Sequence, residues 1–146
     1  MKRPLACFVL VLAANAAGAA APCTEARTAV DDQYHAVTAM RGMNSLGIAI
    51  EAYARDHGSY PAVATVEELR SLLQPSYAAN LETRDAWGTE LRYVPRPKEG
   101  SYVLVSAGSD RAFDESTWSE PAVSTDSKSD AVFSGGFVRK WSIVFP

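Results

Sequence analysis

The chain has 146 residues, enough for one domain with a single hydrophobic core, and a formal net charge of −3. Loss of a leader containing Lys2 and Arg3 would lower the charge to −5, because the 14 basic residues would fall to 12 while the 17 acidic ones remain. This balance argues against proteins that bind nucleic acids or anionic membrane surfaces.

The N-terminus has the features of a secretory signal peptide. Lys2 and Arg3 precede an apolar segment, residues 5–12, that is too short to span a bilayer, and small residues follow it. We therefore expect residues 1–20 to be removed and residues 21–146 to form a single domain in the periplasm or outside the cell. No membrane insertion is expected after removal of the signal.

The two cysteines raise separate questions. Cys7 would leave with the signal, so Cys23 would be the one thiol of the mature chain. Pro22 stands where lipidation requires a small residue, which argues against a lipoprotein. Cys23 is then either an idle residue in a mobile N-terminal tail or the partner of a cysteine in another molecule.

A long amphipathic helix is predicted over residues 28–57. Its apolar stripe has spacings of three and four and consists of Met43, Leu46, Ile50, Tyr53 and His57, with a weaker extension at Ala36, Val37, Ala39 and Met40. Gly58 suits the left-handed position that follows a helix, and Pro61 prevents a restart. Gly42 and Gly47, inside the helix, indicate a bend or close packing.

The rest of the chain predicts a small antiparallel sheet, and the fold class is therefore α+β. Thr65 can cap a short helix over residues 66–73. Residues 89–95 and 101–107 have the pattern of a first hairpin, and residues 130–146 that of a second one turned at Ser134-Gly135-Gly136.

Between the hairpins lies a long polar segment, residues 108–130, which we call the 108–130 loop. A compact domain rarely keeps such a loop unless it is functional or held in place. Calcium prefers six to eight hard oxygen ligands, and the loop offers the carboxylates of Asp110, Asp114, Glu115, Asp126 and Asp130. Two alternatives to a metal remain open: Arg111 pairs with an acid in its place, or the loop is solvated and Asp110 closes a turn.

No catalytic motif is found. The sequence has no nucleophile elbow, zinc-protease motif, C-x-x-C pair or phosphate-binding glycine loop. His35 and His57 are the two side chains that could act as bases near neutral pH, and both fit a helix surface or a helix end. We therefore expect a protein that is not an enzyme.

The three tryptophans differ in their sequence surroundings. Trp87 and Trp141 lie in stretches predicted to be structured, so we expect both in the core, with Trp87 beside the helix stripe. Trp118 lies in the polar loop and is the candidate aromatic residue for binding a ligand.

Five segments occur in the order found in one known family. They are AIEAYARDHGSYP, LQP, DAWGTELRYVP, YVLVSAGSDRAFD and SDAVFSGGFVRKW. In them the chain resembles the globular domain of the major pseudopilin of type II secretion, protein G, over roughly residues 36–141. The resemblance implies a long helix packed on a small antiparallel sheet and a calcium ion that holds the 108–130 loop. Matched to the family pattern, the ligands would be the carbonyl of Ala107, the side chain of Asp110 and a carboxylate from Asp126 or Asp130.

The resemblance does not extend to the N-terminus. Family members begin with a short basic leader and a hydrophobic helix, where this chain has a secretory signal and the polar segment TEARTAVDDQYHA. We therefore expect a non-catalytic structural or accessory protein with a protein partner in a secretion system, and not a filament subunit. The alternative is a periplasmic binding module that uses the 108–130 loop to hold a glycan or a protein.

Overall fold

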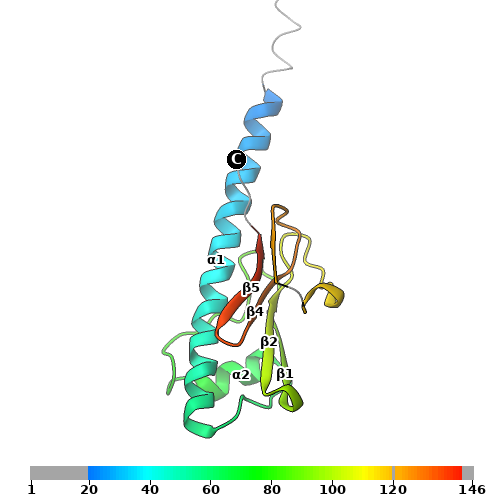
Figure 1. The fold of residues 1–146 in the computed structure, drawn as a ribbon. Helices are drawn as coiled ribbons and strands as arrows, with labels where there is room; N and C mark the ends of the chain where they lie inside the picture. The colour runs from blue at the N-terminus through cyan, green and yellow to red at the C-terminus, as the bar shows by residue number, and fades with distance from the viewer. Residues whose placement is uncertain (1–19, 120, 143–146) are drawn as a thin grey trace, which may run out of the picture.

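The computed structural model describes residues 20–119 and 121–142, in which a long helix lies along a five-stranded sheet (Figure 1). All but the last residue of the expected signal peptide lies outside the described residues. The predicted α+β fold with a long N-terminal helix is confirmed. Within residues 20–119 and 121–142, no helical segment combines the length and the apolar character that a bilayer crossing requires.

Helix α1 (Ala20–His57) ends where the sequence predicts and begins earlier, at Ala20 instead of residue 28. Gly58 has φ +74°, and its N–H donates to the carbonyl of Ala54 at 2.8 Å, which closes the last turn. Pro22 falls in the first turn, where a missing N–H costs nothing. Cys23 therefore lies within the helix and not in a mobile tail.

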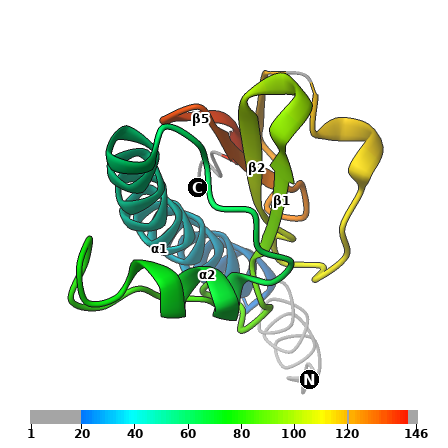
Figure 2. The ribbon, with the colours of Figure 1, turned by 90° about the horizontal axis from the view of Figure 1, so that it is seen from below.

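Helix α2 (Val66–Leu73) has the predicted bounds. The hydroxyl of Thr65 accepts a hydrogen bond from the N–H of Glu68 at 3.2 Å, which is the predicted cap. The buried face of α2 joins the core that α1 forms with the sheet, and it consists of Val66, Leu69 and Leu73. Figure 2 shows both helices on the same side of the sheet.

Four of the five strands form the two predicted hairpins. Strand β1 (Arg92–Arg96) is joined to β2 (Ser101–Ser106) by the 3-10 turn η1 (Pro97–Glu99). Strand β4 (Ala131–Ser134) is joined to β5 (Phe137–Ser142) by the predicted glycine turn. Both pairs are antiparallel, as the sequence predicts.

Pairing between the hairpins completes the sheet, whose order is β1-β2-β4-β5-β3. Strands β2 and β4 are antiparallel, with Leu104 opposite Phe133. Strand β3 (Ala122–Ser124) was not predicted, and it pairs in parallel with β5 at the edge of the sheet. Three residues are too few to show a recognisable alternation of polar and apolar side chains.

The main core lies between the stripe of α1 and one face of the sheet. Leu46 and Ile50 are 0% exposed and pack in one cluster with Met43, Tyr93, Tyr102, Leu104 and Phe133. Tyr53 is half-buried at the margin of this cluster. His57, the last residue of the predicted stripe, is exposed and stacks on Tyr53, with ring centroids 3.9 Å apart.

Gly47 allows α1 to approach the sheet closely. A Cβ atom at this position would lie 2.2 Å from Cε1 of Phe133, whose ring is itself buried in the core. The nearest neighbour of a Cβ at Gly42 would be 3.8 Å away, which is an ordinary contact. Close packing is therefore the reason for Gly47 and not for Gly42.

Glu51 adds a polar link between α1 and the residues facing it. Its carboxylate accepts hydrogen bonds from the hydroxyl of Tyr102 at 3.1 Å and from that of Tyr60 at 3.2 Å. Burial, and then the negative charge of Glu51, raises the pKa of Tyr102 above that of a free tyrosine. The Tyr102 hydroxyl therefore stays protonated and remains a donor to Glu51.

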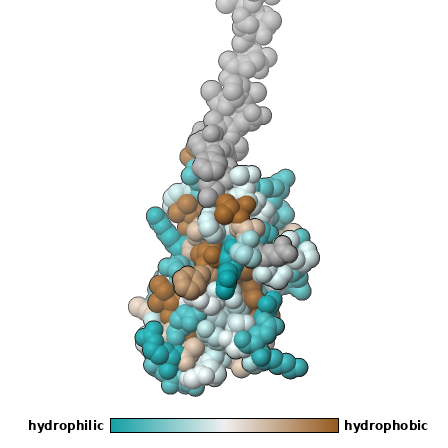
Figure 3. All heavy atoms as spheres, in the orientation of Figure 1, coloured by the Kyte–Doolittle hydropathy of each residue, from teal (hydrophilic) through white to brown (hydrophobic). Residues whose placement is uncertain are grey.

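The opposite side of α1 faces solvent. Its exposed apolar side chains are those of Val30, Tyr34, Val37 and Ile48. Val37 was expected in the weaker part of the stripe, which is wrong, whereas Ala36 and Ala39 are buried as expected. Figure 3 shows apolar residues scattered over the middle of one face of the domain and polar residues around its lower end.

Truncation of the buried stripe tests this packing. Leu46→Ala and Ile50→Ala are expected to lower the free energy of unfolding by about 2–5 kcal/mol each, because each leaves a cavity beside the sheet. Ile48→Ala, on the same helix but 61% exposed, is the matched control and is expected to change it by less than about 0.5 kcal/mol. Urea unfolding measures all three. Equal losses at positions 46 and 48 would mean that the packed face of α1 is misassigned.

Candidate functional site in the loop between the hairpins

The two ends of the 108–130 loop are joined to each other. The N–H of Ser109 donates to the carbonyl of Ser127 at 2.9 Å, and the hydroxyl of Ser127 donates to Asp32 on α1 at 3.0 Å. Gly108 has φ +71°, and a Cβ there would lie 2.6 Å from the carbonyl oxygen of Ser127. A residue without a side chain is required at Gly108, because both the backbone conformation and the close approach exclude others.

Three aspartates of the loop close local turns through their Oδ1 atoms. Asp110 accepts from the N–H of Ala112 at 3.0 Å, and Asp126 accepts from the N–H of Lys128 at 3.0 Å. Asp114 accepts from the N–H of Ser116 at 3.2 Å. The turn hydrogen bond at Asp110, which was one of the alternatives to a metal, is therefore present, and these bonds stabilise the loop locally.

Asp130 connects the end of the loop to its middle. Asp130 is 3% exposed, and its Oδ2 accepts from the indole Nε1 of Trp118 at 2.6 Å and from the N–H of Asp114 at 2.9 Å. Its second oxygen, Oδ1, is buried with no hydrogen-bond partner. A buried anionic oxygen without a partner is costly, which makes Oδ1 the strongest indication of a cation in this loop.

Aromatic side chains of the loop cover the sheet face that α1 does not cover. Trp118 is 7% exposed and packs in a second cluster with Val103, Val105 and Val132, and Phe113 lies against this cluster. The sequence did contain a signal for this cover, namely the run of consecutive apolar residues in β2. A strand that is apolar at successive positions is covered on both faces. Trp118 is therefore a core residue, and the prediction that it is exposed for ligand binding is wrong.

The predicted burial of the other two tryptophans in the core is also wrong. Trp87 lies beside α1, with its ring 5.8 Å from that of His35, but it is half-buried and outside both core clusters. Its Nε1 atom is buried without a hydrogen-bond partner. Trp141 is likewise half-buried on β5.

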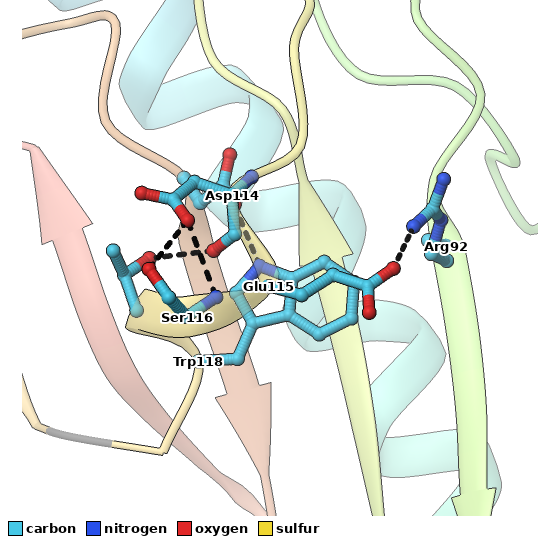
Figure 4. A network of polar contacts seen from close by, with 7 residues as sticks. Arg92, Asp114, Glu115, Ser116 and Trp118 are labelled. Atoms are coloured by element: carbon cyan, nitrogen blue, oxygen red, sulfur yellow. Dashed lines mark hydrogen bonds and ion pairs between the residues drawn. The ribbon is translucent and has the colours of Figure 1, made fainter.

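Arg92 of β1 holds the middle of the loop from outside. Its guanidinium lies 4.2 Å from the ring centroid of Phe113 and 5.6 Å from that of Trp118. It also forms an ion pair with Glu115 at 2.7 Å, and the two side chains point toward one another in Figure 4. Each contact is modest by itself, about 0.5–1 kcal/mol at an exposed position. Together they fix the 3-10 turn η2 (Glu115–Thr117) over the aromatic residues.

Arg111, whose pairing with an acid was one of the alternatives to a metal, does not take that role in the described part of the chain. It is exposed, its φ is +59°, and the ion pairs among the described residues do not include it. Arg92, from a strand outside the loop, is the residue that pairs with an acid of the loop, namely Glu115. The sequence suggested Arg111 because it lies within the loop. The contact between Arg92 and Glu115 depends instead on how the β1–β2 hairpin is placed.

The aspartates line one hollow, which we call the acidic hollow. It has a volume of about 360 Å³, and its charged lining residues are Asp110, Asp114, Asp126, Asp130, Lys128 and Lys140. The structure therefore brings three of the predicted ligands together, namely those at positions 110, 126 and 130. Ala107 is fully buried and does not line the hollow.

The donor set of the acidic hollow fits a hard cation in charge and in atom type, because carboxylate oxygens are the ligands that calcium prefers. The orphaned Oδ1 atom of Asp130 is available to such an ion. Within residues 20–119 and 121–142, however, no three acidic, histidine or cysteine side chains are close enough together to share one ion. Ligation by Asp110 and Asp126 would therefore require their carboxylates to turn away from the backbone N–H groups that they accept from.

Comparison with known proteins identifies the family. The family model for protein G of the type II secretion system matches residues 28–119, more than half of the chain, from α1 through β2 and into the 108–130 loop. The chain therefore belongs to the type II secretion system protein G family, whose members are pseudopilins. No curated protein and no solved structure matched the chain.

Removal of one indole N–H tests the role of Asp130. Trp118→Phe keeps an aromatic ring but deletes the 2.6 Å bond to Asp130, so the free energy of unfolding is expected to fall by about 1.5–3 kcal/mol. Trp87→Phe is the matched control, since the N–H that it removes has no partner, and it is expected to cost less than about 1 kcal/mol. Urea unfolding measures both variants. If the two substitutions cost the same, the indole bond does not hold the loop.

Proposed function

We propose that this protein is a structural component of a type II secretion machine that acts outside the cytoplasm through protein partners and catalyses no reaction. The family match across α1, α2, β1 and β2 carries this proposal. The family is structural, its members work within a multiprotein machinery, and they face the extracytoplasmic side. The placement of the two histidines is consistent with a non-catalytic role, since the imidazole of His57 bonds the carbonyl of Tyr53 at the end of α1 and that of His35 lies against Trp87.

Deletion of the gene in its native host tests the proposal. Proteins exported by type II secretion are expected to accumulate in the periplasm, and the wild-type gene supplied in trans is expected to restore their release into the medium. Fractionation followed by immunoblotting of one such exported protein measures this, with an exclusively periplasmic protein as the leakage control. Unchanged export in the deletion strain would contradict the proposal.

We further propose that a calcium ion stabilises the 108–130 loop from within the acidic hollow. Asp130 would offer its orphaned Oδ1, and Asp110 and Asp126 would supply the other carboxylates from the same hollow. Water can complete the six to eight oxygen ligands that calcium takes. The carbonyl of Ala107, a ligand by resemblance, is left out of this set because it does not line the hollow.

Thermal unfolding in calcium and in chelator tests this second proposal. At a hundredfold excess over Kd the ion would add about 2.7 kcal/mol of stability, which raises Tm on the order of ten degrees. Asp110→Asn keeps an acceptor for the turn but removes a charge, so it is expected to lose most of the shift. Asp31→Asn, at an exposed site on α1, is the control and keeps it. Magnesium is expected to do little because it retains its water and requires a tighter octahedron. Identical Tm values in calcium and chelator would refute the proposal.

The binding-module alternative has less support. It relied on Trp118 as an exposed aromatic surface, but this side chain is buried under the loop, with Phe113 and Arg92 against it. A glycan would have to displace these contacts to reach the indole. Among the described residues, Phe113 is the one aromatic side chain that lines the acidic hollow.

A further inference from the structure

Lys140 is a basic residue inside the domain. It lies in β5, is 9% exposed, and lines the acidic hollow together with the four aspartates. Lysine is among the residues least often buried, because its ammonium group loses hydration unless negative charge is near. Lys128, the other lysine of the hollow, is exposed at the rim. Negative charge near the ammonium group is therefore expected to favour its position.

The sheet register places Lys140 on the side of the aspartates. Lys140 is the pairing partner of Val132 on β4, and Val132 faces the second cluster under Trp118. Asp130 precedes Val132 by two residues, so the two residues lie on the same face of the sheet. Backbone pairing thus directs the ammonium group and the buried carboxylate to one hollow.

We infer that Lys140 is the built-in counter-charge of the aspartates in the acidic hollow and that it competes with a divalent metal ion for them. Lys140 is in no ion pair within the described part of the chain, and it shares the hollow with the buried Asp130 and the exposed Asp110, Asp114 and Asp126. Opposite charges attract more strongly in a partly buried site than in bulk water, so the attraction is expected to be strongest toward the buried carboxylate of Asp130. The ammonium group therefore offsets the repulsion among the carboxylates when no metal is present, and it opposes an incoming cation.

Competition by Lys140 has a consequence for the loop. The competition between Lys140 and a metal ion rests on the calcium proposal, whereas the role of Lys140 as counter-charge does not. With the ammonium group in place, the 108–130 loop stays ordered without metal. Because Lys140 opposes the ion, a higher calcium concentration is needed before calcium adds stability. Lys140 would thus set the calcium sensitivity of this domain.

Lys140→Met tests the inference, because methionine keeps an unbranched stem but removes the charge. Lys128→Met is the matched control, with the same substitution at the exposed rim. Melting in chelator and in calcium chloride, together with calorimetric titration of calcium, is measured for both variants and the wild type. Lys140→Met is expected to melt below the wild type in chelator, to show a larger calcium-induced rise in Tm, and to bind calcium about tenfold more tightly. Lys128→Met is expected to follow the wild type.

Two results would overturn the inference: a calcium-induced shift in Lys140→Met equal to that of the wild type when the wild type responds, or a Tm in chelator equal to or above that of the wild type. If no protein responds to calcium, the calcium proposal fails and the chelator measurements alone decide. In that case Lys140 is supported as the counter-charge if Lys140→Met lowers Tm in the wild-type background and does not lower it further in the Asp130→Asn background. The side-chain amide that Asp130→Asn introduces can still accept the bonds from Trp118 and Asp114, so this background keeps the loop contacts.

Discussion

Burial of strand β2 on both faces is the constraint on which the rest of the structure depends. Tyr102 and Leu104 face α1, while Val103 and Val105 face the 108–130 loop. An apolar strand gains from burial on each side, at about 25 cal/mol per Å² of apolar surface removed from water. One side is covered by a long helix that approaches closely at Gly47. On the other side the described part of the chain places no α-helix, so the loop must supply the cover.

A polar loop can cover an apolar sheet face only if its few apolar residues are held in place. Trp118 and Phe113 provide the cover, and Asp130 and Arg92 hold them there, one by accepting the indole N–H and the other by lying over the rings. Fixing each loop residue costs about 1–2 kcal/mol of conformational entropy. The turns closed by Asp110, Asp114 and Asp126 offset part of that cost locally. The loop is therefore a second packing layer of the domain.

This arrangement gives the loop a defined surface. Members of this family act within a multiprotein machinery, where partners recognise defined surfaces, and an ordered loop adds to the surface that the helix and the sheet present. The acidic hollow lies between the loop and β5, the strand that carries Lys140. The inferred role of Lys140 and the proposed calcium ion concern the same carboxylates.

Local signals in the sequence were sufficient for the elements whose boundaries depend on neighbouring residues. The end of α1 at His57, the Thr65 cap of α2 and the two hairpins were predicted correctly, because capping, glycine conformation and alternation act within a few residues. The family was also predicted from ordered motifs, and three aspartates of the candidate site do line one hollow.

Only the tertiary structure decided which side chains are buried and which charges face one another. Three features depend on partners far away in the sequence. Trp118 is buried while Trp87 is not, Arg92 contacts the loop where Arg111 does not, and Lys140 is buried. Strand β3 exists because β5 offers it a free edge, and three residues by themselves carry no strand signal. Burial and electrostatics depend on distances in space, which a linear pattern of residues does not contain until the sheet register is known.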